Sequence, residues 1–468
     1  MDQDTQPQAL AAAARRPAAS LVDGRIAPTL ILFSLPILAS NVLQSINASI
    51  NAAWIGNLLG TRALTASANA NSVLFFLMSV SFGLSMAATI LVGQSFGARD
   101  MAQTKRVMGT STLFFSLFST ALAALGFVIA PVILRAMDTP PDAAPMASAY
   151  LRIIFLGVPA IFFFNFMMMA LRGAGDSRTP FVFLLISAFF DTGLNPLLIH
   201  GLGPVPRLGI AGSALATTIA QWLALALLMA WLYVNRHPLC LHRTDARYFR
   251  IDRAILRSLI VKGVPMGLQV VAVSSSMIVL ISLVNSFGSL TVAAYGACFQ
   301  LWNYIQMPAF AVGNAVSSMA AQNVGAGRWD RVSRIAWVGV LYNVLLTGAL
   351  VGAVTLFDHA AFALFLGGNQ EAIDIARHMH LIASWSFIVF GAAFVLASIV
   401  RATGAVMVPL LIMVVSVWGV RLPLAAWLSG TGVDGVLWGF PAGSIAMLVL
   451  IAAYYRYGGW RGAKMLEG

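Results

Sequence analysis

Residues 93–98 read Gly93-Gln94-Ser95-Phe96-Gly97-Ala98, and the motif Gln94-x-x-Gly97-Ala98 within them returns in the second half of the chain as Gln322-x-x-Gly325-Ala326, at an offset of 228 from position 94 to position 322. Further landmarks keep this spacing to within one position across half of the chain, which chance does not produce. The sequence therefore predicts two related halves, and this period, about half of 468 residues, is far longer than a solenoid repeat. The landmark pairs with an offset of 228 or 229 are Arg172-x-x-Gly175 with Arg401-x-x-Gly404, Pro180 with Pro409, Pro36 with Pro265, Gly60 with Gly288, and Arg106 with Arg334.

The composition places these halves in a membrane. Apolar residues make up 59% of the chain and charged residues only 9%, which is too little charge to cover a soluble protein of this length. The net charge of +12 does not indicate a nucleic-acid partner, because the basic residues lie in short breaks between apolar runs and not on one polar face. We expect a monomeric membrane transporter with two related bundles around a central site.

Twelve apolar runs are long enough to cross a bilayer, which takes about 20 residues. Six precede and six follow a basic stretch at 236–257, so the two halves are parallel in the membrane. We therefore predict an all-α membrane protein of twelve transmembrane helices in two pseudo-symmetric six-helix lobes. The predicted spans lie near 28–56, 64–93, 107–136, 147–171, 179–200, 209–234, 258–286, 292–321, 332–366, 375–400, 406–429 and 433–456. The predicted divisions are a flexible cytoplasmic tail (1–25), an N-lobe (26–236), a linker (237–257), a C-lobe (258–457) and a second cytoplasmic tail (458–468).

The basic residues orient these spans. Alternate loops and both tails carry 22 of the 28 Lys and Arg residues, and such loops lie on the cytoplasmic side. We therefore expect a multi-pass protein of the inner (plasma) membrane with both termini in the cytoplasm. The basic linker also suggests contact with lipid headgroups.

Further motifs follow the repeat along the chain. In their order and spacing they resemble the multidrug and toxic compound extrusion (MATE) family, and its DinF-like branch in particular. The resemblance implies a V-shaped pair of six-helix lobes and cation-coupled export of amphipathic, often cationic small molecules by alternating access. The motifs are Gly93-Gln94-x-x-Gly97-Ala98, Leu171-Arg172-Gly173-x-Gly175-Asp176, Gly209-Ile210-Ala211-Gly212-Ser213-Ala214-x-Ala216-Thr217, Arg421-x-Pro423-Leu424-Ala425 and Tyr454-Tyr455-Arg456-x-Gly458-x-Trp460.

The chain carries no sign of an enzyme. It has no phosphate-binding glycine loop, metal motif or catalytic triad, and Cys240 and Cys298 lack metal or redox spacing. We therefore expect neither a cofactor nor a metal.

Asp191 is the one acid well inside a predicted span, and ionisable groups at such depth are costly enough to suggest a function. A carboxylate there can bind a proton or a cationic compound, although an acid held only for packing remains an alternative. In the branch that the chain resembles, this span reads Asn-x-x-x-Asp-Pro, whereas here it reads Asp191-x-x-x-Asn195-Pro196. Residues four apart share one helical face, so we predict that Asp191 and Asn195 act together in ion coupling.

The first predicted span supplies amides. In the branch of the family that this chain resembles, an acid lies fifteen residues after the proline of this span. Counted from Pro36, that position is Asn51 here. We predict that Asn51 joins the ion-coupling group and that Pro36 is a hinge. Because buried amides need partners, we expect at least one amide of this span to bond Asp191. The predicted substrate-binding residues are Asn41, Gln44, Asn47 and Phe190.

The sequence leaves the coupling ion open. One acid among amides favours H⁺ over Na⁺, but amide oxygens can also bind Na⁺.

The C-lobe carries no comparable acid. The position at which another branch of the family has a Glu is Val273 here, so ion coupling is expected in the N-lobe. Arg421 is interpreted as a structural charge paired with carbonyls or an amide. A lipid or lipid-linked-saccharide flippase and a passive channel or scramblase remain as alternatives to an exporter.

Overall fold

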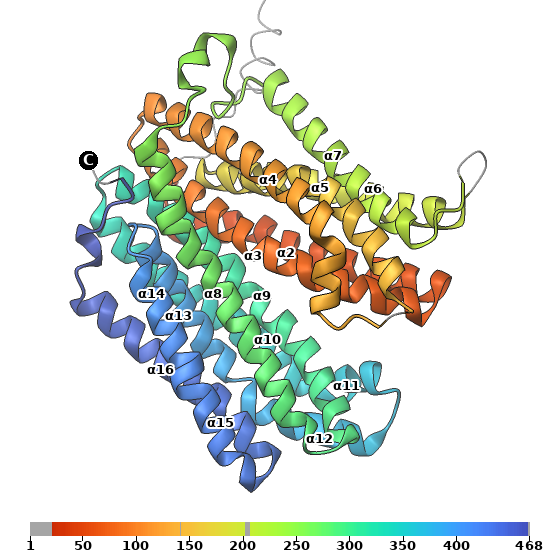
Figure 1. Ribbon diagram of the computed structural model, residues 1–468. Helices are drawn as coiled ribbons and strands as arrows, with labels where there is room; N and C mark the ends of the chain where they lie inside the picture. The colour runs from red at the N-terminus through yellow and green to blue at the C-terminus, as the bar shows by residue number, and fades with distance from the viewer. Residues whose placement is uncertain (1–20, 141, 202–205, 467–468) are drawn as a thin grey trace, which may run out of the picture.

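The computed structural model describes residues 21–140, 142–201 and 206–466, and within these residues it is helical and contains no strand (Figure 1). The predicted all-α class is therefore confirmed. The N-lobe contains α2 (Ile26–Leu59), α3 (Thr61–Gly97), α4 (Met101–Ala136), α5 (Ala144–Gly173), α6 (Arg178–His200) and α7 (Ile210–Val234). The C-lobe contains α8 (Arg253–Asn285), α9 (Ser289–Gly325), α10 (Trp329–Leu356), α11 (Asp358–Leu366), α12 (Gln370–Ala383), α13 (Ser386–Arg401), α14 (Met407–Val414), the π-helix η2 (Val415–Arg421), α15 (Leu422–Leu428), η3 (Ser429–Thr431) and α16 (Val433–Tyr457).

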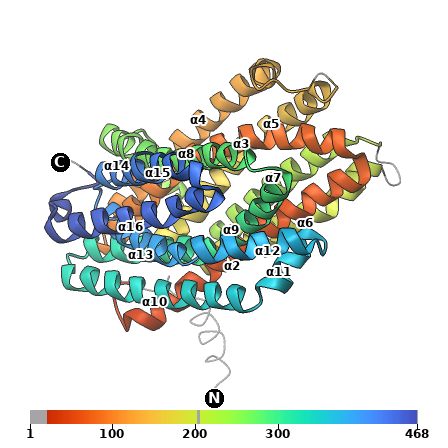
Figure 2. The same cartoon turned by 90° about the horizontal axis from the view of Figure 1, so that it is seen from below.

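The two lobes meet along helices that are far apart in sequence. Helix α3 packs against α8 and α9, and α2 packs against α9, so these four helices lie at the centre with the other helices outside them (Figures 1 and 2). Glycines permit the close approach of α3 to α8, because a Cβ at Gly83 would overlap backbone atoms of Gly263 and Gly267.

Ten of the described helices are long and apolar enough to cross a membrane, and the pair α12–α13, bent by 41°, makes an eleventh candidate. The predicted span 292–321 is α9, a helix of 37 residues. It is not among these eleven candidates and is more polar, with Gln300, Asn303, Gln306 and Asn314 along it. The predicted number of twelve spans counts α9 in addition to the eleven.

The span predicted near 332–366 contains two helices. The segment is divided into α10 and α11 at Phe357. Asp358 starts the new helix and forms an ion pair of 2.9 Å with Arg377 of α12, which holds the break in place. The span predicted at 375–400 is likewise bent, between Ala383 and Ser386.

The repeated motifs bind each other across the two lobes. Gln94 Nε2 donates to the carbonyl oxygen of Ala402 at 2.8 Å, and Gln322 Nε2 donates to that of Gly173 at 2.8 Å. The offset from Gly173 to Ala402 is 229 and that from Gln94 to Gln322 is 228, so the two bonds are pseudo-symmetric copies. They support the predicted relation between the halves.

Glycine completes this junction. A Cβ at Gly97 would overlap the carbonyl oxygen of Gln322, and a Cβ at Gly325 would overlap that of Gln94. We call Gln94, Gly97, Gln322 and Gly325 the interlobe clasp. It lies at the linker end, by which we mean the end of both lobes that carries the segment joining them.

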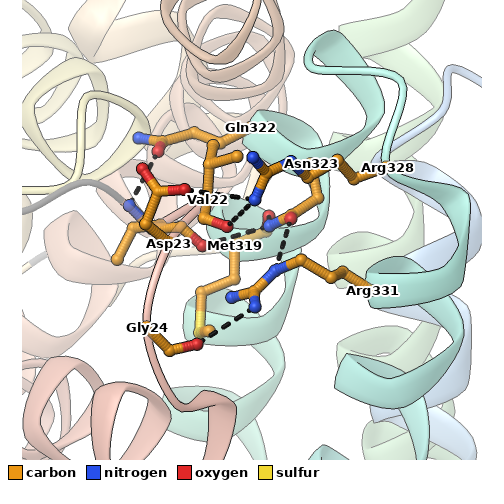
Figure 3. Close-up of polar contacts among 9 residues, drawn as sticks. Val22, Asp23, Gly24, Met319, Gln322, Asn323, Arg328 and Arg331 are labelled. Carbon is orange, nitrogen blue, oxygen red and sulfur yellow. Dashed lines mark hydrogen bonds and ion pairs between the residues drawn. The ribbon is translucent and has the colours of Figure 1, made fainter.

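The segment before α2 is bound to the C-lobe (Figure 3). The predicted flexible tail 1–25 is thus wrong for its described part, because side chains at the end of α9 and at the start of α10 bond backbone groups of Leu21, Val22 and Gly24. Residues 1–20 lie outside the described residues. We call Leu21–Gly24 the strap. Its bonds run from Leu21 N to Gln322 Oε1 (3.2 Å), from Asn323 Nδ2 to Leu21 O (3.1 Å), from Arg328 to Val22 O (2.9 Å) and from Arg331 to Gly24 O (3.0 Å).

The linker is docked as well. Lys105 Nζ lies 2.7 Å from both carboxylate oxygens of Asp245, in the 3₁₀ helix η1 (Arg243–Tyr248), and this bond holds the pKa of Asp245 below its usual value. Asp252 caps α8 by accepting from the backbone N–H groups of Ala254 and Ile255. The C-lobe therefore begins its first helix at Arg253, earlier than the predicted residue 258.

We predict that Gly325→Leu opens the linker end. Its side chain would meet the backbone carbonyl of Gln94, which cannot rotate away as a side chain can, so α3 and α9 must separate. The measurement is the distance between spin labels at Ala98 and Asp330, both exposed, and it should lengthen. In the control Gly296→Ala, on the same helix and with nothing within 4 Å of the added carbon, the distance should stay unchanged. An unchanged distance in Gly325→Leu would contradict a role for the clasp.

Candidate functional site

Asp191 lies on α6 with 3% of its surface exposed, and α2 supplies two donors to it. Asn47 Nδ2 lies 2.8 Å from Asp191 Oδ2, and Asn51 Nδ2 lies 2.7 Å from the same oxygen. Asn47 and Asn51 are four residues apart and share one face of the helix. The predicted contact between the first span and Asp191 is therefore present.

The second carboxylate oxygen is bonded from two other positions. Asp191 Oδ1 accepts from Asn195 Nδ2 at 3.1 Å, one turn along α6, and from Thr217 Oγ1 at 2.9 Å, on α7. Three helices, α2, α6 and α7, thus meet at one carboxylate. All four donors are neutral, and within the described residues no ion pair involves Asp191.

The amides around Asp191 have a defined orientation. Asn51 Oδ1 accepts from Asn195 Nδ2 at 3.1 Å, and Asn47 Oδ1 accepts from Thr192 Oγ1 at 3.3 Å. Each amide therefore directs N–H toward the carboxylate and oxygen away from it. This arrangement stabilises a carboxylate that accepts hydrogen bonds. Adding a proton would turn one acceptor into a donor, so at least one of these four bonds would have to rearrange.

The other predicted residues of this region have no hydrogen bond to the carboxylate among the described residues. Gln44 is exposed and donates to the carbonyl oxygen of Ser40 in its own helix at 3.3 Å. Phe190 is half-buried and packs edge-to-face on Phe189 at 5.7 Å between ring centroids. Asn41 is half-buried as well. Their role in substrate binding stays a prediction, as does the hinge at Pro36, through which α2 continues as a helix.

Sequence reasoning missed one of the four donors. Thr217 ends the glycine-rich motif that opens the sixth predicted span. The sequence therefore predicts its position in that span but not its hydrogen bond to Asp191. A threonine in an apolar helix commonly bonds its own backbone, and only the packing of α7 against α6 turns this hydroxyl toward Asp191. Tyr150 of α5 is also near enough to interact electrostatically with the carboxylate.

Arg421 is the corresponding charge of the C-lobe, with 7% of its surface exposed. Instead of the carbonyl or amide partner expected from the sequence, its guanidinium carbon lies 3.7 Å from the centroid of the Phe440 ring. One guanidinium nitrogen lies 3.5 Å from the sulfur of Met277, which is a weak acceptor.

A separate pocket of about 410 Å³ lies in the C-lobe between Thr291 of α9, α12 and Val433 of α16. Glu371, Asp374 and His378 contribute its polar groups. None of these residues is bonded to Asp191, so this open pocket of the C-lobe is separate from the buried carboxylate of the N-lobe.

Comparison with known proteins assigns the chain to a family. The MatE family model matches residues 36–197 and again residues 265–427, which covers most of both lobes. The chain belongs to the MatE family. The starts of the two matches are offset by 229 and their ends by 230, in agreement with the repeat that is visible in the sequence.

Individual MatE relatives match over nearly the whole chain. The probable multidrug resistance protein YoeA of Bacillus subtilis (strain 168) is 38% identical over 91% of this chain and 92% of its own length. The probable multidrug resistance protein YpnP of the same organism is 33% identical over 94% of this chain and 97% of its own. A solved structure, the outward-facing conformation of a multidrug resistance MATE family transporter, superposes with a TM-score of 0.87 at 18% identity, over 94% of this chain and 97% of that one. This similarity shows that the fold is that of MATE transporters.

We predict that Thr217→Val destabilises this MatE protein by about 1–3 kcal/mol, because a buried carboxylate loses a hydrogen-bond donor without a change of volume. Unfolding in detergent measures this loss. Thr218→Val is the matched control, since Thr218 lies beside Thr217 and bonds the carbonyl oxygen of Ile153 instead. In Thr217→Val, addition of Asp191→Asn should recover part of the loss, because the uncharged amide needs fewer donors. Additive losses would contradict the coupling between the two residues.

Proposed function

We propose that this chain is a secondary active exporter of amphipathic, cationic small molecules, driven by the exchange of protons and working by alternating access. The observation that carries the proposal is Asp191, a carboxylate buried in a membrane bundle and surrounded only by neutral donors. The printed names of YoeA and YpnP, probable multidrug resistance proteins, support the substrate class.

The exchange follows from the charge of this site. An ionised Asp191 without a basic partner attracts one positive charge, and either a proton or a cationic compound can supply it. The two therefore compete, so that entry of a proton releases the compound. Asn47 and Asn51 lie on α2 and Thr217 lies on α7, and all three donate to Asp191 on α6. Protonation of Asp191 therefore changes bonds among these helices, which links proton binding to a rearrangement of the N-lobe.

The orientation of the amides favours H⁺ over Na⁺ as the coupling ion. Sodium takes several oxygen ligands, whereas Asp191 faces the N–H groups of Asn47 and Asn51 while their oxygens bond Asn195 and Thr192. Binding of Na⁺ would require both amides to turn over and would break these bonds.

The basic residues support a cytoplasmic position for the linker end and for both termini, in the inner membrane. The clasp joins the lobes at that end, so the closed side faces the cytoplasm and the compound leaves on the opposite side. Movement to an inward-open state then requires the clasp to separate.

Two alternatives make different demands. A flippase for lipids or lipid-linked saccharides needs a basic cavity, whereas the buried site around Asp191 is acidic and Arg421 is the one basic residue proposed to face a compound. A channel or scramblase conducts only downhill, so uphill transport distinguishes it from the exporter.

We predict that Asp191→Asn abolishes uphill export driven by a pH gradient in proteoliposomes. The amide keeps the shape of the side chain but cannot bind and release a proton. The matched control is Asp374→Asn, which changes an exposed acid of the C-lobe pocket and should retain transport. Gel filtration and thermal unfolding must show that Asp191→Asn is folded. Continued uphill export by Asp191→Asn would refute the role of Asp191 and direct attention to Glu371 and Asp374.

The coupling ion is tested with separate gradients on the unchanged protein. A pH gradient at equal Na⁺ should drive accumulation of the compound, and a Na⁺ gradient at equal pH should not. Accumulation with Na⁺ alone would overturn the proton coupling, and accumulation with neither gradient would indicate a passive pathway.

A further inference from the structure

Arg421 occupies the position in the C-lobe that Asp191 occupies in the N-lobe. An offset of 229 from Asp191 gives Val420, and the offset of 230 at which the two family matches end gives Arg421. The π-helix η2, which ends at Arg421, holds more residues per turn than an α-helix and explains one extra residue. The two lobes therefore carry opposite charges at equivalent positions of α6 and η2.

The surroundings of the two charges correspond helix by helix. Gly209 and Gly212 open α7 as Gly432 and Gly435 open α16, at an offset of 223, and the same offset relates Thr217 to Phe440. Thr217 contacts Asp191, and Phe440 contacts Arg421. On the remaining side, α2 contacts Asp191 through Asn47, and α8 contacts Arg421 through Met277.

Several donors around Arg421 lack an acceptor. The buried Nε atom of Arg421, the hydroxyl of Tyr295 and the Nε1 atom of Trp302 have no hydrogen-bond partner among the described residues. Tyr295 interacts electrostatically with Arg421. The rings of Tyr295 and Trp302 are 5.8 Å apart, and those of Trp302 and Phe440 are 5.1 Å apart, so these groups form one cluster.

Arg421 differs in its place along the helix from the other buried arginines, although the Nε atom of Arg172 also lacks a partner and its Nη1 atom contacts only the sulfur of Met169, at 3.9 Å. Arg172 and Arg401 lie in the last turns of α5 and α13, where the carbonyl end of a helix favours positive charge. Arg401 also donates to Gln269 Oε1 at 2.9 Å and to Ser398 Oγ at 2.7 Å. Arg421 lies inside the candidate span Met407–Thr431, and no ion pair among the described residues includes it. A charge in such a place is costly.

We propose that Arg421, with Tyr295 and Trp302, forms a binding site for a carboxylate group, and that the transporter accepts compounds which carry a carboxylate as well as a cationic centre. The inference rests on the proposed export function and specifies its substrate class. A guanidinium binds a carboxylate through two parallel hydrogen bonds, and the tyrosine and tryptophan add neutral donors. In the absence of a carboxylate, the sulfur of Met277 contacts the guanidinium group, and its flexible thioether side chain can move away when a carboxylate binds.

The test uses two fluorescent dyes that differ by one group. Rhodamine 110 has a free carboxylate and rhodamine 123 is its methyl ester, with the same cationic ring system. Fluorescence polarisation with the purified full chain gives a Kd for each. Arg421→Gln should raise the Kd of rhodamine 110 by about tenfold or more, as expected for loss of a charge-assisted bond, and should change that of rhodamine 123 by less than about twofold.

Further variants separate binding from folding. Tyr295→Phe removes only a hydroxyl and should weaken rhodamine 110 by about threefold, even if Arg421→Gln does not fold. Tyr455→Phe, which removes a buried hydroxyl that lies outside this cluster, should change the binding of neither dye. Asp191→Asn should weaken both dyes, because both are cationic.

Each result supports or overturns the proposal. If Arg421→Gln and Tyr295→Phe affect the two dyes equally, or affect neither, the carboxylate site is refuted while the exporter stands. If the unchanged protein binds neither dye, both the site and the proposed substrate class fail. If only rhodamine 123 depends on Asp191, the two charges do not act on one compound and the inference is again overturned.

Discussion

The backbones of α3 and α9 touch at Gly97 and Gly325, and the positions of the two lobes depend on this approach. Neither glycine can carry a side chain without striking a carbonyl oxygen of the other lobe. The carbonyls in question belong to Gln94 and Gln322, whose side chains then cross to the opposite lobe. One short motif thus supplies both the space for contact and the bonds that hold it, and the repeat supplies it twice.

Much of the architecture follows from the sequence because it depends on properties that are local or additive. The length of apolar runs predicts spans, and the spacing of Gln94 and Gln322 predicts related lobes. A bond between Asp191 and one of the amides of the first span could be expected, because a buried carboxylate and a buried amide each need a partner. Which amides form it, Asn47 and Asn51, could not be expected. The break at Phe357 could not, because the ion pair between Asp358 and Arg377 that accompanies it joins two helices that are separate in sequence.

The same limit applies to the site. The hydroxyl of Thr217 and the aromatic neighbours of Arg421 come from helices that are separate in sequence, and no local pattern marks their direction. The strap was missed for a related reason. Its residues are bonded chiefly through backbone groups, which every sequence provides, and their partners lie in the opposite half of the chain. Composition alone makes such a segment resemble a free tail.

The strap also affects the order in which the molecule is completed during synthesis. Leu21–Gly24 emerges before any membrane helix, yet its acceptors and donors on α9 and α10 follow only in the second lobe. Because domains form progressively from the N-terminus while the chain is made, these first residues must wait until helix α10 has been inserted. The strap is thus among the last segments to reach its place, and its docking reports that both lobes are assembled.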